Sequence, residues 1–173
     1  MTIASPPKSF DRPLPPSRGG AAAGMLSELP SADACAVLAF RLWCDGMQTD
    51  APASIAAFCT LAQGVAQTQS FAQLIAIMIQ SPRRPIMHHG LTSACFGGDE
   101  AVFSHVIAAA TCGDHEDPMA VAMLLTTPAA AWQAVLAAKP VGLALLGLCR
   151  TAPIQPAAAR HLNQQRTSPC ACL

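Results

Sequence analysis

The stretch from Pro82 to Glu100, PRRPIMHHGLTSACFGGDE, gathers the side chains of this chain that are best suited to chemistry. It contains two arginines, two adjacent histidines and a cysteine: Arg83, Arg84, His88, His89 and Cys95. Imidazole and thiolate are ligands that zinc prefers, a cysteine near a histidine can act as an activated nucleophile, and arginines bind carboxylates and phosphates. These five residues are the candidate binding loop of the chain.

A zinc site is the first chemistry to consider for this loop. It offers at most three ligands, His88, His89 and Cys95, and adjacent histidines point in different directions. A second group of possible ligands follows further along the chain: Cys112, Asp114, His115, Glu116 and Asp117. A helix over residues 99–112 would hold the two groups roughly 20 Å apart. One ion could not use both groups, so we expect no cofactor, with zinc or another transition metal in the loop as the alternative.

An anion site and a thiol nucleophile are two further kinds of chemistry that the loop could support. Arg83 and Arg84 could face a helix N-terminus at Gly97–Gly98, where free N–H groups attract anions. Asp99 and Glu100 already supply negative charge there, and no glycine-rich nucleotide motif is present. Cys95 precedes the same helix start, which favours a thiolate, but a cysteine and a histidine this close in sequence are no catalytic signature. No residue is singled out as catalytic, and we expect a chain without enzymatic activity.

Helix start and stop signals surround the loop on both sides. Apolar residues at helical spacing, together with capping residues and prolines, predict helices that begin near Ser31, Asp50, Ser70, Gly98, Asp117, Thr127 and Pro140. Alternating apolar runs typical of strands do not appear. The predicted fold is therefore all-α, an irregular bundle of six or seven short helices. Residues 81–98 connect two of these helices by a span longer than the usual ~4–6 residues, which is common in functional loops.

The two ends of the chain differ in composition from its middle. Residues 1–30 are rich in proline and glycine and predict a disordered arm. Within it, PLPPSR (residues 13–18) has the spacing of a polyproline ligand. Residues 150–173 predict a flexible tail, whose last four residues, CACL, fit a prenylation box. A single helical domain is expected between them, over residues 31–149.

The charge of the chain narrows the class of partner. Ten acidic and ten basic residues give a net charge of zero, so we expect no nucleic-acid partner. Charged residues make up only 12% of the chain, about half of the usual ~25%. Few charges leave little repulsion between molecules, which favours a protein partner or a homo-oligomer.

The apolar stretches and the cysteines indicate where in the cell the protein is located. Glutamines interrupt residues 51–82, and Pro128 and Pro140 interrupt residues 118–149, so we expect core helices and no membrane partner. No apolar signal segment follows the first basic residues. Eight cysteines are then expected as reduced thiols in a cytoplasmic protein. The predicted function is a small helical protein-interaction or self-association module without catalytic activity; a small metal- or thiol-dependent protein is the alternative.

Overall fold

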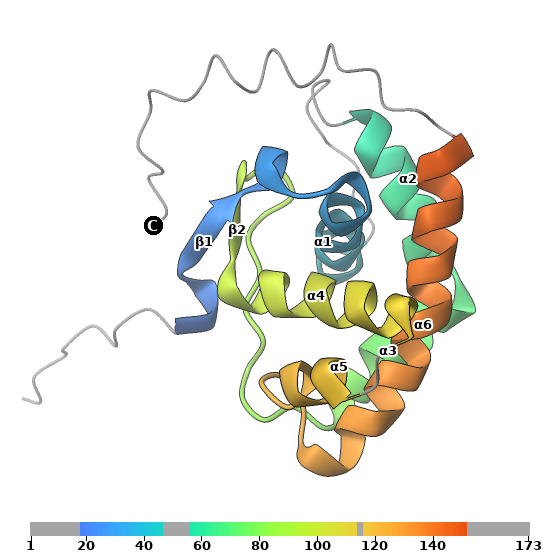
Figure 1. Ribbon diagram of the computed structural model, residues 1–173. Helices are drawn as coiled ribbons and strands as arrows, with labels where there is room; N and C mark the ends of the chain where they lie inside the picture. The colour runs from blue at the N-terminus through green and yellow to red at the C-terminus, as the bar shows by residue number, and fades with distance from the viewer. Residues whose placement is uncertain (1–17, 47–55, 114–115, 152–173) are drawn as a thin grey trace, which may run out of the picture.

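The computed structural model describes residues 18–46, 56–113 and 116–151. Within these ranges the helices are α1 (Ser31–Cys44), α2 (Ala56–Ala66), α3 (Gln69–Gln80), α4 (Gly98–Cys112), α5 (Glu116–Ala122) and α6 (Pro128–Thr151). Strands β1 (Ala22–Met25) and β2 (Cys95–Gly97) form a small antiparallel sheet, and short 3-10 turns, η1 (Arg18–Gly20) and η2 (Leu26–Glu28), flank β1. The predicted all-α bundle is confirmed, with α6 along one side and the strands at the other (Figure 1).

The domain begins earlier than the sequence indicated. β1 lies within the expected disordered arm, yet it pairs with β2, with Ala22 opposite Gly97 and Met25 opposite Cys95. Two further backbone hydrogen bonds extend this pairing, from Leu26 N to Ala94 O at 2.8 Å and from Gly98 N to Ala21 O at 3.1 Å. The boundary expected at residue 31 is corrected, because strand pairing orders a segment that has few large side chains to bury.

Several sequence predictions lie outside the described residues. These are the remainder of the arm (residues 1–17), the helix start at Asp50, the possible ligands Asp114 and His115, and the tail with its CACL ending. Other helix ends were predicted well. α1 begins at Ser31, and Gly113 follows α4 in a left-handed conformation with φ of 88°, as expected of a helix stop.

Residues 128–151 form one helix where the sequence predicted two. Pro140 was expected to open a separate helix, but it lies inside α6. Proline removes one backbone donor and costs about 3 kcal/mol inside a helix. The buried face of α6 continues across it, with Val135 and Ala138 on one side and Val141 and Leu145 on the other. Packing of this continuous face against the core outweighs the local cost.

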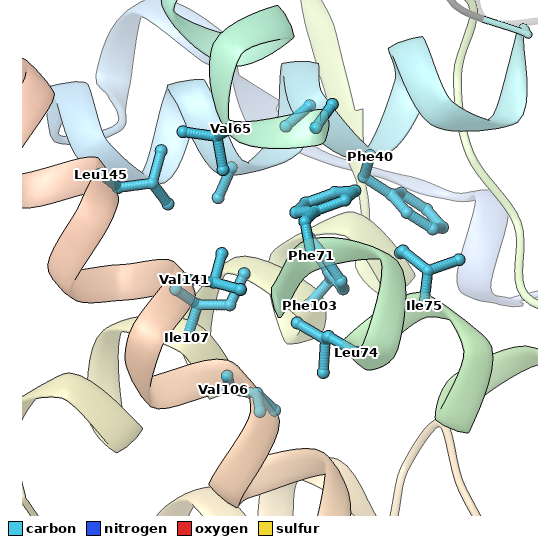
Figure 2. Close-up of a cluster of buried hydrophobic side chains, with 14 of the residues drawn as sticks. Phe40, Val65, Phe71, Leu74, Ile75, Phe103, Val106, Ile107, Val141 and Leu145 are labelled. Carbon is cyan, nitrogen blue, oxygen red and sulfur yellow. The ribbon is translucent and has the colours of Figure 1, made fainter. Parts of the chain in front are cut away.

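The centre of the core is aromatic (Figure 2). Phe40 of α1 stacks on Phe103 of α4 with ring centroids 4.8 Å apart, and Phe71 of α3 meets Phe103 edge-on at 6.0 Å. Aliphatic side chains from α2, α4 and α6 surround these rings, including Val65, Ile107 and Val141. Three helices far apart in sequence are thus joined at one point, and this point lies close to the ion pair described below.

α6 also has the length and composition of a membrane-spanning helix. Among the described residues, one segment passes that test, Pro128–Arg150, with a hydropathy of 1.5 and a third of its window buried. A core helix of a folded domain passes the same test. One face of α6 packs against α3 and α4, so the segment's apolar character is partly explained by the core.

α4 and α6 approach closely at Gly142, which gives a first prediction. A Cβ at Gly142 would overlap Thr111 Oγ1 and lie 3.0 Å from Ile107 O. We expect Gly142→Ala to lower the free energy of unfolding by about 1–3 kcal/mol, as overpacking does. Gly64→Ala, in α2 with open space around the new methyl, should raise it by about 0.5–1 kcal/mol. Urea unfolding followed by tryptophan fluorescence measures both; equal stability of the two variants would contradict the close approach.

Candidate functional site

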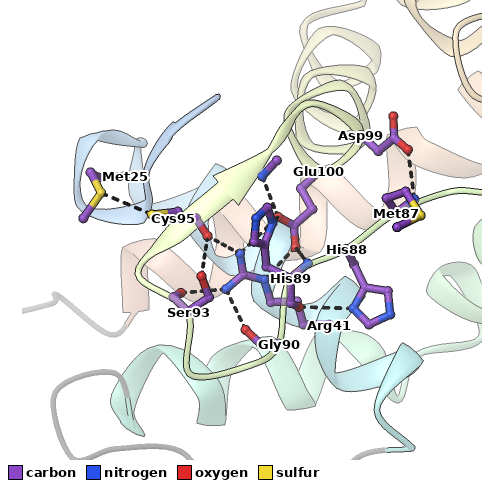
Figure 3. A network of polar contacts seen from close by, with 11 residues as sticks. Met25, Arg41, Met87, His88, His89, Gly90, Ser93, Cys95, Asp99 and Glu100 are labelled. Carbon is purple, nitrogen blue, oxygen red and sulfur yellow. Dashed lines mark hydrogen bonds and ion pairs between the residues drawn. The ribbon is translucent and has the colours of Figure 1, made fainter. Parts of the chain in front are cut away.

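A buried ion pair that the sequence analysis did not single out lies beneath the 81–98 loop. Arg41 of α1 and Glu100 of α4 have fully buried side chains. Arg41 Nε donates to Glu100 Oε1 at 2.6 Å, and Nη2 donates to Oε2 at 3.1 Å. This is the bidentate arrangement in which an arginine fork matches a carboxylate (Figure 3).

The rest of the Arg41 guanidinium holds the backbone of the loop. Nη1 donates to Gly90 O at 3.2 Å and to Ser93 O at 2.8 Å, and Nη2 donates to Cys95 O at 2.6 Å. Three carbonyls of the loop are therefore fixed by one side chain of α1. Arg41 ties a long connection to the core.

Glu100 holds the loop from the other side. Its oxygens accept hydrogen bonds from Gly97 N at 2.7 Å and from His89 N at 3.1 Å, and His89 Nδ1 lies 3.0 Å from Oε2. Among the described residues, no buried side-chain nitrogen or oxygen lacks a hydrogen-bond partner. Arg41, Glu100 and the loop groups that they bind form one saturated network, which we call the Arg41–Glu100 clamp.

The clamp keeps Glu100 ionised. Burial alone would raise the pKa of this carboxyl, but the hydrogen bond and charge of Arg41, with the N–H groups of Gly97 and His89, hold the pKa below its usual value. All of these groups act on the folded state. The carboxylate is thus committed to structure, with no free oxygen that points to a ligand.

The adjacent histidines point in different directions, as the sequence predicted. His89 is mostly buried and turns toward Glu100. His88 is exposed, and its Nδ1 lies 3.1 Å from His89 O (Figure 3). The His88 ring also meets Phe40 of α1 edge-on, with ring centroids 6.0 Å apart. The two imidazoles do not converge on a common point.

Cys95 does not offer the thiol that a zinc site or a nucleophile needs. It is disulfide-bonded, and its sulfur lies 3.7 Å from Met25 Sδ. The other described cysteines are free: Cys35, Cys44, Cys59, Cys112 and Cys149. Among the described cysteines, the expectation of reduced thiols is therefore wrong only for Cys95. Burial, with a contribution from the neighbouring Cys149, raises the pKa of Cys35 to about 12, so this thiol is a protonated apolar filler at neutral pH.

No arrangement of the described residues favours the metal alternative. Within residues 18–46, 56–113 and 116–151, no group of three or more His, Cys, Asp or Glu side chains is placed to hold a metal ion. α4 runs unbroken from Gly98 to Cys112, so the loop and Cys112 lie at opposite ends of a helix roughly 20 Å long. The helix expected between the loop and Cys112 is therefore present, and Asp114 and His115 of the second group lie outside the described residues.

The two arginines of the loop differ in their surroundings. Arg84 pairs with the buried Asp99, through Nη1 to Oδ2 at 2.7 Å and Nη2 to Oδ1 at 2.5 Å, and this contact raises the pKa of Arg84. Asp99 also accepts from Met87 N at 2.9 Å. Arg83 is exposed, and its Nη1 donates to Met123 O at 3.2 Å. Arg84 is thus neutralised by Asp99 at the start of α4, and Arg83 lines the same pocket while it hydrogen-bonds to Met123 and Leu125.

Sequence reasoning missed Arg41, although a signal was present. In CAVLAFRLWC, residues 35–44, Arg41 is the single charged residue among apolar side chains. A charge on a buried helix face requires a partner. Glu100 was assigned only to the helix dipole, because its approach to Arg41 joins positions 59 residues apart.

No family model, curated protein or solved structure matches this chain. What the chain does must be argued from its own residues.

Proposed function

We propose that this chain is a non-catalytic helical module that self-associates through the outward face of α6. The observation that carries the proposal is a stripe of large apolar side chains on that helix: Trp132, Leu136, Leu143 and Leu146, each between 38% and 54% exposed. Their spacings of four, seven and three residues place them on one side of the helix. We call this surface the α6 stripe.

A second copy of the chain is the occupant that the stripe suits best. The stripe is nearly symmetric about Lys139, because Trp132 and Leu146 lie seven positions to either side. In an antiparallel pair of α6 helices, Trp132 of one copy therefore faces Leu146 of the other, and Leu136 faces Leu143. With a net charge of zero, two copies do not repel one another at long range.

The expected dimer is weak. Removing a half-exposed leucine or tryptophan from water contributes on the order of 1 kcal/mol, so eight such side chains contribute roughly 8 kcal/mol. Association costs about 4–15 kcal/mol in lost translational and rotational freedom. At the low end of that cost about 4 kcal/mol remains, which corresponds to a dissociation constant near ~1 mM, typical of small transient interfaces.

Sedimentation equilibrium over a range of concentrations tests the proposal. We expect a monomer–dimer equilibrium for the natural chain, and a monomer throughout for Leu136→Glu, which buries a charge at the centre of the contact. Gln73→Glu is the matched control, because it adds the same charge at an exposed position on α3. A natural chain that stays monomeric at about 1 mM would contradict the proposal.

A substitution at Lys139 distinguishes a second copy of the chain from other possible partners of the α6 stripe. In the antiparallel pair the two Lys139 ammonium groups lie near the symmetry axis and repel one another, so Lys139→Met should tighten the dimer. An acidic protein or an anionic lipid surface would instead lose affinity on this change. Weaker self-association of Lys139→Met would overturn the antiparallel arrangement, and binding of anionic vesicles by a monomer would assign the stripe to a membrane surface.

The cytoplasmic location and the absence of a nucleic-acid partner stay predictions from the sequence.

A further inference from the structure

A cavity of about 440 Å³ opens at the N-terminal end of α4, beside the start of the 81–98 loop. Arg83, Arg84 and Asp99 supply its charged lining, and Val102 and Leu124 supply apolar lining. Its volume lies at the small end of the range for small-molecule sites. No residue of the α6 stripe belongs to it, so it is independent of the self-association proposed above.

The charge of the cavity favours an anion. Asp99 is saturated by Arg84 and by the N–H of Met87, so its carboxylate is neutralised within the wall. Arg83 forms no ion pair within the described part of the chain, and one hydrogen bond, to Met123 O, accounts for part of its guanidinium. Two arginines and one aspartate leave a charge of +1, carried by Arg83.

The backbone around the cavity is fixed before any ligand arrives. Arg83 N donates to Leu125 O at 2.8 Å, and Thr127 N donates to Ser81 O at 2.9 Å, which joins the loop to the segment between α5 and α6. On the opposite side, Gly98 N donates to Ala21 O at 3.1 Å. A binding site whose walls are already paired loses little conformational entropy when it is filled.

We propose that this cavity binds a small organic anion. Its carboxylate or phosphate group pairs with Arg83, and a short apolar body lies on Val102 and Leu124. Leu124 is half-exposed and gains most from being covered. Arg83 is exposed and lines the cavity, so it can form a charge-assisted hydrogen bond without disturbing the Arg84–Asp99 pair.

Amide chemical shifts during titration test the site, with hexanoate, hexyl phosphate and the neutral analogue hexanamide as probes. We expect hexanoate or hexyl phosphate to shift residues of the loop and the first turn of α4 with millimolar affinity, and hexanamide to bind at least tenfold more weakly. The tighter of the two anions identifies the headgroup. Titrations are made at a protein concentration where the chain is monomeric, so failure of either proposal leaves the other standing.

Two arginine variants decide whether the site is specific. Arg83→Gln should weaken anion binding at least tenfold, and Arg150→Gln, at an exposed position outside the cavity, should leave it unchanged. Arg83→Gln keeps the backbone bond to Leu125, so its fold should persist and its spectrum reports directly on binding. Equal weakening by both variants, or no shift with about 20 mM of any probe, would overturn the proposal.

Discussion

Replacing Arg41 by methionine is expected to lower the free energy of unfolding by about 3–5 kcal/mol, because it leaves Glu100 as a buried charge without its partner. The same change removes one donor each from the carbonyls of Gly90, Ser93 and Cys95. Ser93 still donates to Gly90 O through its N–H and to Cys95 O through its hydroxyl. Domains of this size are stable by about 5–15 kcal/mol. The loss is therefore a large fraction of the total stability.

Companion variants separate the ion pair from simple loss of volume. Arg41→Lys keeps the charge but cannot bind the five acceptor oxygens that Arg41 reaches, so an intermediate loss is expected. The double variant Arg41→Met/Glu100→Leu removes both charges and should recover part of the stability lost by Arg41→Met alone. Arg150→Met is the matched control on an exposed arginine and should change stability by less than about 0.5 kcal/mol.

Urea unfolding gives the four free energies, and hydrogen exchange of residues 89–97 reports on the loop directly. Faster exchange in this segment, with α6 still protected, would show that the clamp orders the loop. An Arg41→Met protein as stable as Arg150→Met would show that the clamp does not hold the fold together.

The helices were largely predictable because their signals are local. The start at Ser31 and the stop at Gly113 depend on residues within one turn of each helix end. Pro140 was misread for the opposite reason, since a proline reads locally as a helix start, and only the packing of residues on both sides keeps α6 continuous. β1 was missed because its pairing partner, β2, lies about 70 residues further along the chain.

The site was only half predictable. The sequence pointed to the 81–98 loop and correctly predicted the helix that separates this loop from Cys112. What organises the loop is a partner on α1, and no pattern within the loop points to it. The saturation of Asp99 by Arg84 likewise removed the repulsion that had argued against an anion there. Both the ordering of the loop and the neutralisation of Asp99 depend on pairs of charges that are far apart in the sequence.

Acid is expected to weaken the fold through Glu100. The folded-state pKa of this carboxyl lies below its usual value, so its ionised form stabilises the folded state. That contribution is fully present above the unfolded-state pKa and is lost as the pH falls through the folded-state pKa. Among the described residues, Arg41 on α1 and His89 in the loop contact it directly, and the Cys44 thiol at the end of α1 interacts with its charge.

Glu100→Gln should make the free energy of unfolding depend less steeply on pH. Between about pH 6 and pH 3, a single carboxyl changes the free energy of unfolding by at most ~1.4 kcal/mol per pH unit, and the variant should lose up to that slope. Asp33 acts in the opposite direction, because burial raises its pKa despite the nearby His105. Asp33→Asn should therefore steepen the acid loss.

Measuring urea unfolding at several pH values for the natural chain, Glu100→Gln, Asp33→Asn and the double variant isolates the two carboxyls. The Glu100→Gln protein should be less stable at neutral pH and less sensitive to acid. If its slope equals that of the natural chain, Glu100 takes up no proton on unfolding, and the charge that the clamp is inferred to hold is not there.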